Sequence, residues 1–151
     1  MSPRKSRHVS SLTAGEMLFQ SDAGSLTALT ADRFPILEGL SVKRLVLEPG
    51  SIREPHWHAN ATELTYCLSG DLLVGMLGNA DSFSSFTIGS GQMFTAPSGS
   101  LHHIENVGDT TAELIVAFRH ERPEDFSFRA SLAAMSDAVL GNTYGLDASA
   151  F

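Results

Sequence analysis

The sequence predicts an all-β fold, a sandwich or barrel of short strands that ends in short helices. Segments of strand length with β-favouring residues recur through the middle of the chain. Turn pairs such as Pro49-Gly50 and Gly108-Asp109 separate these segments about every ten residues, a rhythm typical of sandwiches and barrels. Only the C-terminal part shows apolar residues at helical spacing.

The expected strands follow from runs of β-branched and apolar residues between turn signals. They cover residues 42–48, 71–77, 83–88, 92–96 and 112–118, in addition to two strands in the histidine-containing region. The helical region is defined by Leu132, Met135, Val139 and Leu140, which are expected to pack. Its N-cap is expected at Ser131 or Ser136, and its stop at Gly141-Asn142.

Size and charge limit the classes of protein to which the chain can belong. At 151 residues and 16.2 kDa it has the length of one domain, so we expect a disordered tail over 1–15 and a single domain over 16–151. The net charge of −7 makes nucleic acid a poor partner, and the basic residues Arg4, Lys5 and Arg7 are expected to belong to the tail.

The start of the chain and its apolar content predict a location. The first fifteen residues lack the apolar run of roughly 7–15 residues that a signal peptide needs, and no uncharged apolar stretch of about 18 residues follows. The expectation is a soluble, cytoplasmic protein without a membrane partner. The single cysteine, Cys67, excludes an intramolecular disulfide and is expected to pack in the interior, with a place on a pocket wall as the alternative.

Two histidines are spaced to share one metal ion. His56 and His58 are two residues apart, so on a strand both point to one face with Cα atoms roughly 6.6 Å apart, while Trp57 points away. Glu63 follows His58 at an odd offset that a continuous strand cannot bring to that face. We therefore expect a turn over 59–62 and a second strand that begins at Glu63.

Alternation along the second strand places Glu63, Thr65 and Cys67 toward the site. A further histidine follows later in the chain, where His102 and His103 are adjacent and a strand points only one of them inward. The residues themselves leave this choice open. Three imidazoles and one carboxylate suit a divalent transition metal such as manganese, iron, nickel or zinc.

Two segments carry a family resemblance. From Gly50 the chain runs GSIREPHWHANATELTYCLSG, and from Gly91 it runs GQMFTAPSGSLHHIEN. These segments resemble the two motifs of the cupin superfamily, G-x5-H-x-H-x4-E-x6-G and G-x5-P-x-G-x2-H-x3-N. The resemblance implies a cupin-type jelly-roll barrel, assigns His102 to the metal and places His103 outside. The implied ligands are His56, His58, Glu63 and His102.

A looser resemblance covers roughly residues 25 to 145. The phrases LEPGSIREPHWH and HHIENVGD are similar to the C-terminal cupin of manganese-dependent oxalate decarboxylases, and ATELTYCLSGDLLVGMLG is also similar to germin-like proteins. This resemblance implies Mn²⁺ and a small carboxylate substrate, with Arg53 binding one carboxylate. Pairing of Arg53 with Glu54 or another acid is the alternative. Arg53 and His56 have opposite strand parity, so a shared direction requires a bend near Pro55.

The proton donor of those decarboxylases has no direct counterpart, because their short Ser-Glu-Asn-Ser-Thr loop is absent. The corresponding region reads His120-Glu-Arg-Pro-Glu-Asp, in which Glu121 is the candidate acid and Glu124 or Asp125 the alternatives. An oxalate oxidase, a cupin dioxygenase, a sugar isomerase and a non-catalytic metal-containing binding module remain open. A single cupin is expected to form a homodimer through its N-terminal strands and C-terminal helices.

Overall fold

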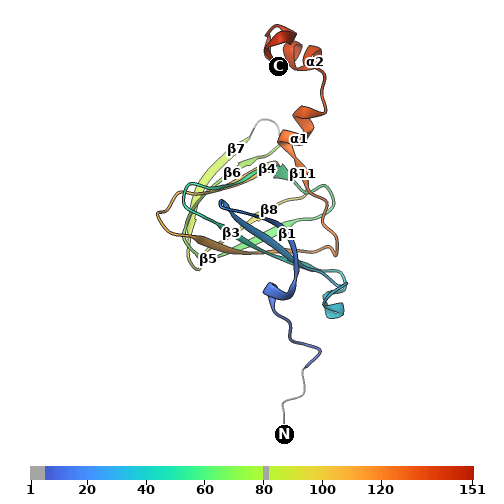
Figure 1. Ribbon diagram of the computed structural model, residues 1–151, viewed down its shortest axis with the longest axis vertical. Helices are drawn as coiled ribbons and strands as arrows, with labels where there is room; N and C mark the ends of the chain where they lie inside the picture. Colours follow the sequence, from blue (N-terminus) through green and yellow to red (C-terminus); the bar gives the residue numbers. More distant parts are fainter. Residues whose placement is uncertain (1–5, 80–81) are drawn as a thin grey trace.

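The computed structural model describes residues 6–79 and 82–151 as two antiparallel sheets that face each other in a jelly roll (Figure 1). The six-stranded sheet has the order β1 (Glu16–Ser21), β2 (Gly24–Leu29), β3 (Ser41–Leu47), β10 (Ala112–Phe118), β5 (Glu63–Ser69), β8 (Met93–Ala96). The five-stranded sheet has the order β11 (Phe126–Ser127), β4 (Ile52–Trp57), β9 (His102–Asn106), β6 (Asp71–Leu77), β7 (Phe83–Gly89).

The core lies between the sheets because each central strand alternates buried and exposed residues. In β3 and β10 every second residue is buried, as a half-buried strand requires. Both sheets contribute to one apolar cluster. Its larger members are Leu45, Leu47, Leu72, Val74, Ile88, Phe94, Ile104, Leu114, Val116 and Phe118, with Cys67 fully buried among them.

Most predicted strands are confirmed, and three strands, β1, β2 and the two-residue β11, were missed. The ranges 71–77 and 112–118 match β6 and β10, while the other three differ from their strands by a residue at one or both ends. β1 and β2 were not predicted. β1 is a sheet edge with every residue exposed, and β2 does not alternate regularly, so neither has the period of a half-buried strand.

The four motif glycines occupy turns that require a left-handed backbone. Gly50, Gly70, Gly91 and Gly99 have φ values of 73, 96, 85 and 81°, a region that side chains with a Cβ rarely adopt. Gly70 is also sterically constrained, because a Cβ at this position would lie 2.5 Å from the Cβ of Ala112. The spaced glycines therefore position the strand ends around the histidines.

The predicted short C-terminal helices are confirmed, and the described part of the chain has two of them. α1 (Phe128–Ala133) begins after Ser127, and α2 (Asp137–Tyr144) begins after the predicted N-cap Ser136. The stop predicted at Gly141 is wrong, since α2 continues to Tyr144 and ends at Gly145 with φ 67°. Gly141 is instead a packing position: a Cβ there would lie 2.8 Å from the carbonyl oxygen of Leu146.

The chain ends extend away from the sheets in opposite directions (Figure 1). α1 packs beside β4 and β11, whereas α2 packs against the short 3₁₀ helix η3 (Ala148–Ala150). Near the other end, η1 (Leu12–Ala14) contacts β2 and β3, and η2 (Pro35–Leu37) precedes β3. The predicted tail over 1–15 includes residues 1–5, which lie outside the described residues. No helix in the described parts is long and apolar enough to span a bilayer.

Candidate metal centre

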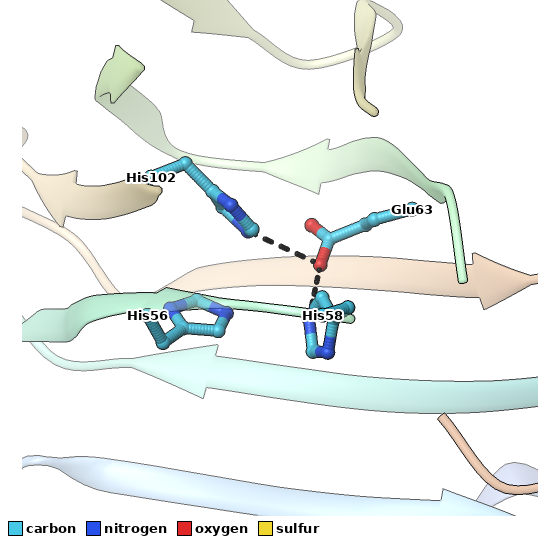
Figure 2. A group of neighbouring side chains, drawn as sticks. All are labelled: His56, His58, Glu63 and His102. Carbon is cyan, nitrogen blue, oxygen red and sulfur yellow. Dashed lines mark hydrogen bonds and ion pairs between the residues drawn. The ribbon is translucent and has the colours of Figure 1, made fainter. Parts of the chain in front are cut away.

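The four predicted ligands meet between the two sheets. Their ligating atoms all lie within 4.8 Å of one another, and Figure 2 shows the side chains pointing toward one centre. The exposed fractions are 2% for His56, 3% for His58, 2% for Glu63 and 1% for His102. Such a converging group of buried polar side chains needs a partner that satisfies all four.

The local backbone explains how the ligands come together. His56 lies near the end of β4 and His58 just beyond it, in the five-stranded sheet. The predicted turn over 59–62 is present as an irregular segment, after which Glu63 opens β5 in the other sheet. His102 opens β9, which pairs with β4. The odd offset between His58 and Glu63 therefore reflects a crossing from one sheet to the other.

Each histidine has its Nδ1 atom held by a backbone carbonyl. Because a carbonyl oxygen only accepts, each Nδ1 carries a proton, which leaves Nε2 as the ring atom that faces the centre. Second hydrogen bonds of this kind orient metal-ligating imidazoles and set their tautomer. The distances are 2.7 Å from His56 to Glu54, 2.7 Å from His58 to Glu124 and 2.9 Å from His102 to Ser100.

The Nε2 atoms of two of the histidines face the Glu63 carboxylate. His58 Nε2 lies 3.1 Å from Glu63 Oε2, and His102 Nε2 lies 3.4 Å from the same oxygen. Among the described residues, the buried His102 Nε2 has no hydrogen-bond partner. A bound cation would take the place of protons between these nitrogens and the carboxylate, and three imidazole nitrogens with one oxygen suit a divalent transition metal. The residues therefore fit the group that the sequence predicts.

The surroundings of the centre favour the protonation states in which Glu63 and His56 bind a metal. Burial would raise the pKa of Glu63, but the facing His102 and His58 rings and the Thr65 hydroxyl outweigh it and hold this pKa well below its usual range. Burial, with Arg53 and His102 nearby, lowers the pKa of His56 to about 3. Burial also opposes the charged form of His102, yet its pKa is raised because Glu63 faces it. Glu63 is thus ionised and His56 neutral at neutral pH.

A small cavity adjoins the histidines. Its volume is about 20 Å³, and its wall includes His56, His58 and Glu63 with the cations Lys43 and Arg53. The apolar part of the wall consists of Leu26, Leu45, Ile104, Val116 and Phe118. The cavity therefore contacts the histidine–glutamate cluster, and the positive charges of Lys43 and Arg53 lie beside it.

Arg53 reaches the cavity because β4 is irregular. Arg53 pairs with Ile104 and His56 pairs with His102, so β4 uses three steps where β9 uses two. This is a β-bulge, and it reverses the parity of Arg53 relative to His56. The bend expected near Pro55 is confirmed. Without the extra residue, Arg53 would point away from His56.

The partner of Arg53 is Asp125. Arg53 Nη2 donates to both Asp125 oxygens, at 2.7 and 2.6 Å, and Lys43 Nζ lies 3.4 Å from Oδ2. The alternative named from the sequence, pairing with Glu54 or another acid, is thus met by Asp125, whereas Glu54 lies 3.6 Å from Arg129. Burial would raise the pKa of Asp125, but the charges of Arg53 and Lys43 lower it further, so this carboxylate is ionised.

Sequence reasoning missed Lys43, although a signal was present. Lys43 follows the alternation of β3 and points to its buried face between Ser41 and Leu45, with Nζ 5.0 Å from the centroid of the Phe118 ring. A lysine on the apolar face of a strand is rarely buried without a charged partner. Asp125 was named only as an alternative acid in a charged loop.

The remaining candidate residues lie apart from the centre. Glu121 accepts a hydrogen bond from the Gly39 amide at 2.8 Å and does not line the cavity. His103 is half-buried on the opposite face of β9, with Nε2 3.0 Å from Glu105. Cys67 is fully buried in the apolar core, facing the interior as its parity predicts. The cavity wall is formed without it.

Oxalate-converting enzymes are among the solved structures with a similar fold. An oxalate oxidase superposes with a TM-score of 0.83 at 27% identity over 99% of this chain and 79% of that chain. A Bacillus subtilis oxalate decarboxylase, studied for its Mn(II) centres, superposes with a TM-score of 0.85 at 25% identity over 92% of this chain and 37% of that chain. Both neighbours contain the jelly roll described above.

Curated relatives are germin-like proteins of plants. Germin-like protein 3-8 of Oryza sativa subsp. japonica is 35% identical over 130 residues, which cover 82% of this chain and 58% of that protein. Germin-like protein subfamily 2 member 2 of Arabidopsis thaliana is 34% identical over 117 residues, covering 76% of this chain and 53% of that protein. The chain thus spans little more than half the length of these relatives.

These relatives overturn one expectation. The predicted cytoplasmic location is contradicted, because the matched germin-like proteins are extracellular proteins of plants. That prediction rested on the apolar content of the first residues, which carries no information on location in a chain that matches part of longer relatives.

The family model described as Cupin matches residues 10–150, which include all four ligand residues and both sheets. The motif spacings, the jelly roll and the buried three-histidine, one-glutamate cluster agree with this match. The chain is a member of the cupin family.

Proposed function

We propose that this cupin is a metal-dependent enzyme that acts on a small carboxylate, by chemistry of the oxalate decarboxylase or oxalate oxidase type. The observation that carries this proposal is the shared cavity, in which the histidine–glutamate cluster and Arg53 line the same small space. A metal and a guanidinium together bind the two ends of a small dianion. Manganese is the proposed metal, since the similar Bacillus subtilis oxalate decarboxylase has Mn(II) centres.

The residues divide the work between binding and shielding. His56, His58, Glu63 and His102 would hold the metal, which would supply Lewis-acid and redox chemistry when bound. Arg53 would bind and orient one carboxylate, with Lys43 adding a second positive charge beside it. The apolar wall excludes bulk water, which strengthens each of these electrostatic contacts.

The proton balance separates the two reactions. Decarboxylation turns one oxalate and one proton into formate and carbon dioxide, so it needs an acid beside the reacting carbon. Oxidation turns one oxalate, one dioxygen and two protons into two carbon dioxide molecules and hydrogen peroxide. Of the three acids in the described loop after β10, only Asp125 lines the cavity, and its carboxylate is ionised beside Arg53 and Lys43, so it serves as a charge partner rather than as that acid.

The test is metal analysis followed by turnover. Protein from manganese-supplemented cells is analysed for bound metal, and oxalate conversion is then followed through formate, carbon dioxide and peroxide. Formate from the manganese protein supports a decarboxylase, and peroxide without formate supports an oxidase. Arg53→Lys should raise KM more than it lowers kcat, because the point charge of lysine cannot replace the planar guanidinium. Bound metal without conversion of any small carboxylate would reject the enzyme proposal in favour of a binding module.

Turnover assays separate the alternatives. The cavity volume of about 20 Å³ is too small for oxalate as well, so it does not choose among substrate sizes. Oxygen uptake gives a further distinction, because a sugar isomerase uses the metal without consuming oxygen. The substrate class is identified by comparing the turnover of oxalate with that of glyoxylate, malonate and a sugar phosphate.

We also propose that the chain forms a homodimer. In β1 the apolar side chains of Met17, Leu18 and Phe19 are 51, 49 and 56% exposed. At the other end, Tyr144 and Leu146 in and after α2 are 53 and 56% exposed, and α2 packs mainly on η3. A second copy would bury these surfaces. A monomer in light scattering coupled to size exclusion would reject the dimer.

A further inference from the structure

The Arg53–Asp125 pair lies between two cavities. The inner cavity of about 20 Å³ contacts the histidines, and an outer cavity of about 500 Å³ lies toward β1, β2 and Arg129. Arg53 and Asp125 line both spaces. The side chain of Asp125 is the more exposed of the two, at 30% against 18% for Arg53. Asp125 is therefore the more accessible member of the pair, although both side chains line the outer cavity.

The inner cavity is too small for a substrate beside the resident carboxylate. A volume of about 20 Å³ holds about one water molecule. Even oxalate has six non-hydrogen atoms. Asp125 already occupies the Arg53 Nη2 donor with both of its oxygens, so a carboxylate that takes this donor requires Asp125 to move.

The structure permits that movement to be small. Asp125 lies in the irregular segment between β10 and β11, whereas Arg53 and Lys43 lie on strands. The backbone just before it is held, since the Glu124 carbonyl accepts from His58 and the Glu124 amide donates to Asn60 at 2.8 Å. A rotation of the Asp125 side chain alone would therefore uncover Arg53 while the histidines keep their orientation.

The charges also suit an exchange. Lys43 and Arg53 carry two positive charges, and Asp125 supplies one negative charge in return. An incoming carboxylate offers the same two oxygens in the same planar geometry. Replacing one carboxylate by another preserves the charge balance around two partly buried cations, so neither cation is left unpaired during binding.

We propose that Asp125 is an internal carboxylate that occupies the substrate's place on Arg53 and Lys43, and that a small carboxylate binds by exchanging with it. This inference rests on the proposed function, since it names the residue that sets affinity and entry at the same site. It predicts that Asp125 lowers the affinity of the protein for carboxylates. A structural ion pair would have the opposite effect, because its loss would disorder Arg53 and weaken binding.

The test is calorimetric binding of oxalate to the zinc-loaded protein, in which the redox-inert metal prevents oxidation. If Arg53 is uncovered in about 1–10% of molecules, removing the competitor raises affinity roughly 10- to 100-fold. Asp125→Asn should show this gain. Glu54→Gln is the matched control, because Glu54 is another acid that lines the outer cavity but pairs with Arg129. It should change the affinity by less than about 3-fold, as expected for a screened charge.

A double mutant separates exchange from a general charge effect. On an Arg53→Gln background, Asp125→Asn should give no gain, because the site of competition is gone. A gain that persists without Arg53, an equal gain from Glu54→Gln, unchanged or weaker binding by Asp125→Asn, or no binding by either protein would each overturn the proposal. A gain in binding without turnover by the manganese protein would instead reject the enzymatic function and leave the exchange standing.

A measurement on the wild-type chain avoids dependence on a folded variant. With ¹³C-labelled aspartate, the side-chain carboxyl signal of Asp125 should move toward that of a solvent-exposed aspartate as oxalate saturates the zinc-loaded protein. Asp32, which pairs with Arg122 on the surface at 3.0 Å, is the internal reference and should not move. A saturated protein with an unmoved Asp125 signal would overturn the exchange.

Discussion

His56 and His102 lie directly opposite each other across the β4–β9 pair, with ring centroids 4.3 Å apart. The sheet register therefore sets the spacing of two ligands before any metal binds. The next residue, His103, necessarily points to the other face, where it lies over Gly75. A single register thus decides which of two adjacent histidines is a ligand.

Replacing each histidine of this pair tests that assignment. His102→Ala should reduce metal affinity by more than the roughly 10- to 100-fold that the loss of an outer partner costs, because it removes a buried ligand. His103→Ala should keep wild-type metal content, since its contact is Glu105. Metal per chain after dialysis, measured by mass spectrometry, decides between them. Equal metal loss in both variants would contradict the register argument.

Thr65 should support the metal through Glu63. Its hydroxyl donates to Glu63 Oε1 at 2.6 Å, and both side chains are buried. Thr65→Val keeps the shape of the side chain but leaves that oxygen unsatisfied, so metal affinity should fall about 10- to 100-fold. Thr65→Ser retains the hydroxyl and should stay close to wild type. Competition with a fluorescent chelator measures both, and equal affinities of the two variants would contradict the role.

Metal uptake should release a proton, and the pKa shifts identify its source. Glu63 is ionised because its pKa is lowered, and His56 is neutral because its pKa is about 3, so neither has a proton to lose near neutral pH. The raised pKa of His102 keeps a proton on that ring above its ordinary value of about 6.5. Metal affinity should therefore rise with pH through that region and then level off.

Calorimetry in two buffers of different ionisation enthalpy measures the released proton directly. At about pH 7, titration of zinc into metal-free protein should release a fraction of one proton attributable to His102. At about pH 9, the release should be smaller, because a rising pH removes the His102 proton before the metal binds. Release that stays constant between these pH values would show that another group supplies the proton.

Two motif glycines should differ in their cost on replacement by alanine. Both Gly50 and Gly70 have positive φ, which costs a residue with a Cβ about 1–2 kcal/mol. Gly50 has open space where the Cβ of an alanine would lie, whereas at Gly70 that atom would lie 2.5 Å from the Cβ of Ala112. Gly70→Ala should therefore cost about 2–5 kcal/mol, since overpacking adds to the backbone strain. Urea unfolding of both variants provides the comparison, and equal losses of stability would contradict the steric argument.

Local signals predicted the strands and the ligand set well. Alternation of apolar residues located β6 and β10, because both faces of a central strand have fixed environments. The same signal failed for β1, whose residues are all exposed at a sheet edge. The rule that glycine ends helices misplaced the stop at Gly141, because a glycine required for close packing on η3 looks the same in sequence as a C-cap.

The sequence by itself determined which side chains share a strand face and where turns interrupt the strands, since both depend on residues within a few positions. The resemblance then chose His102 over His103. Only the tertiary structure decided that Asp125 meets Arg53 across 72 residues and that Lys43 joins them beside the histidines. Those contacts depend on how two sheets pack and on one β-bulge, and neither is encoded in the short-range period of the chain.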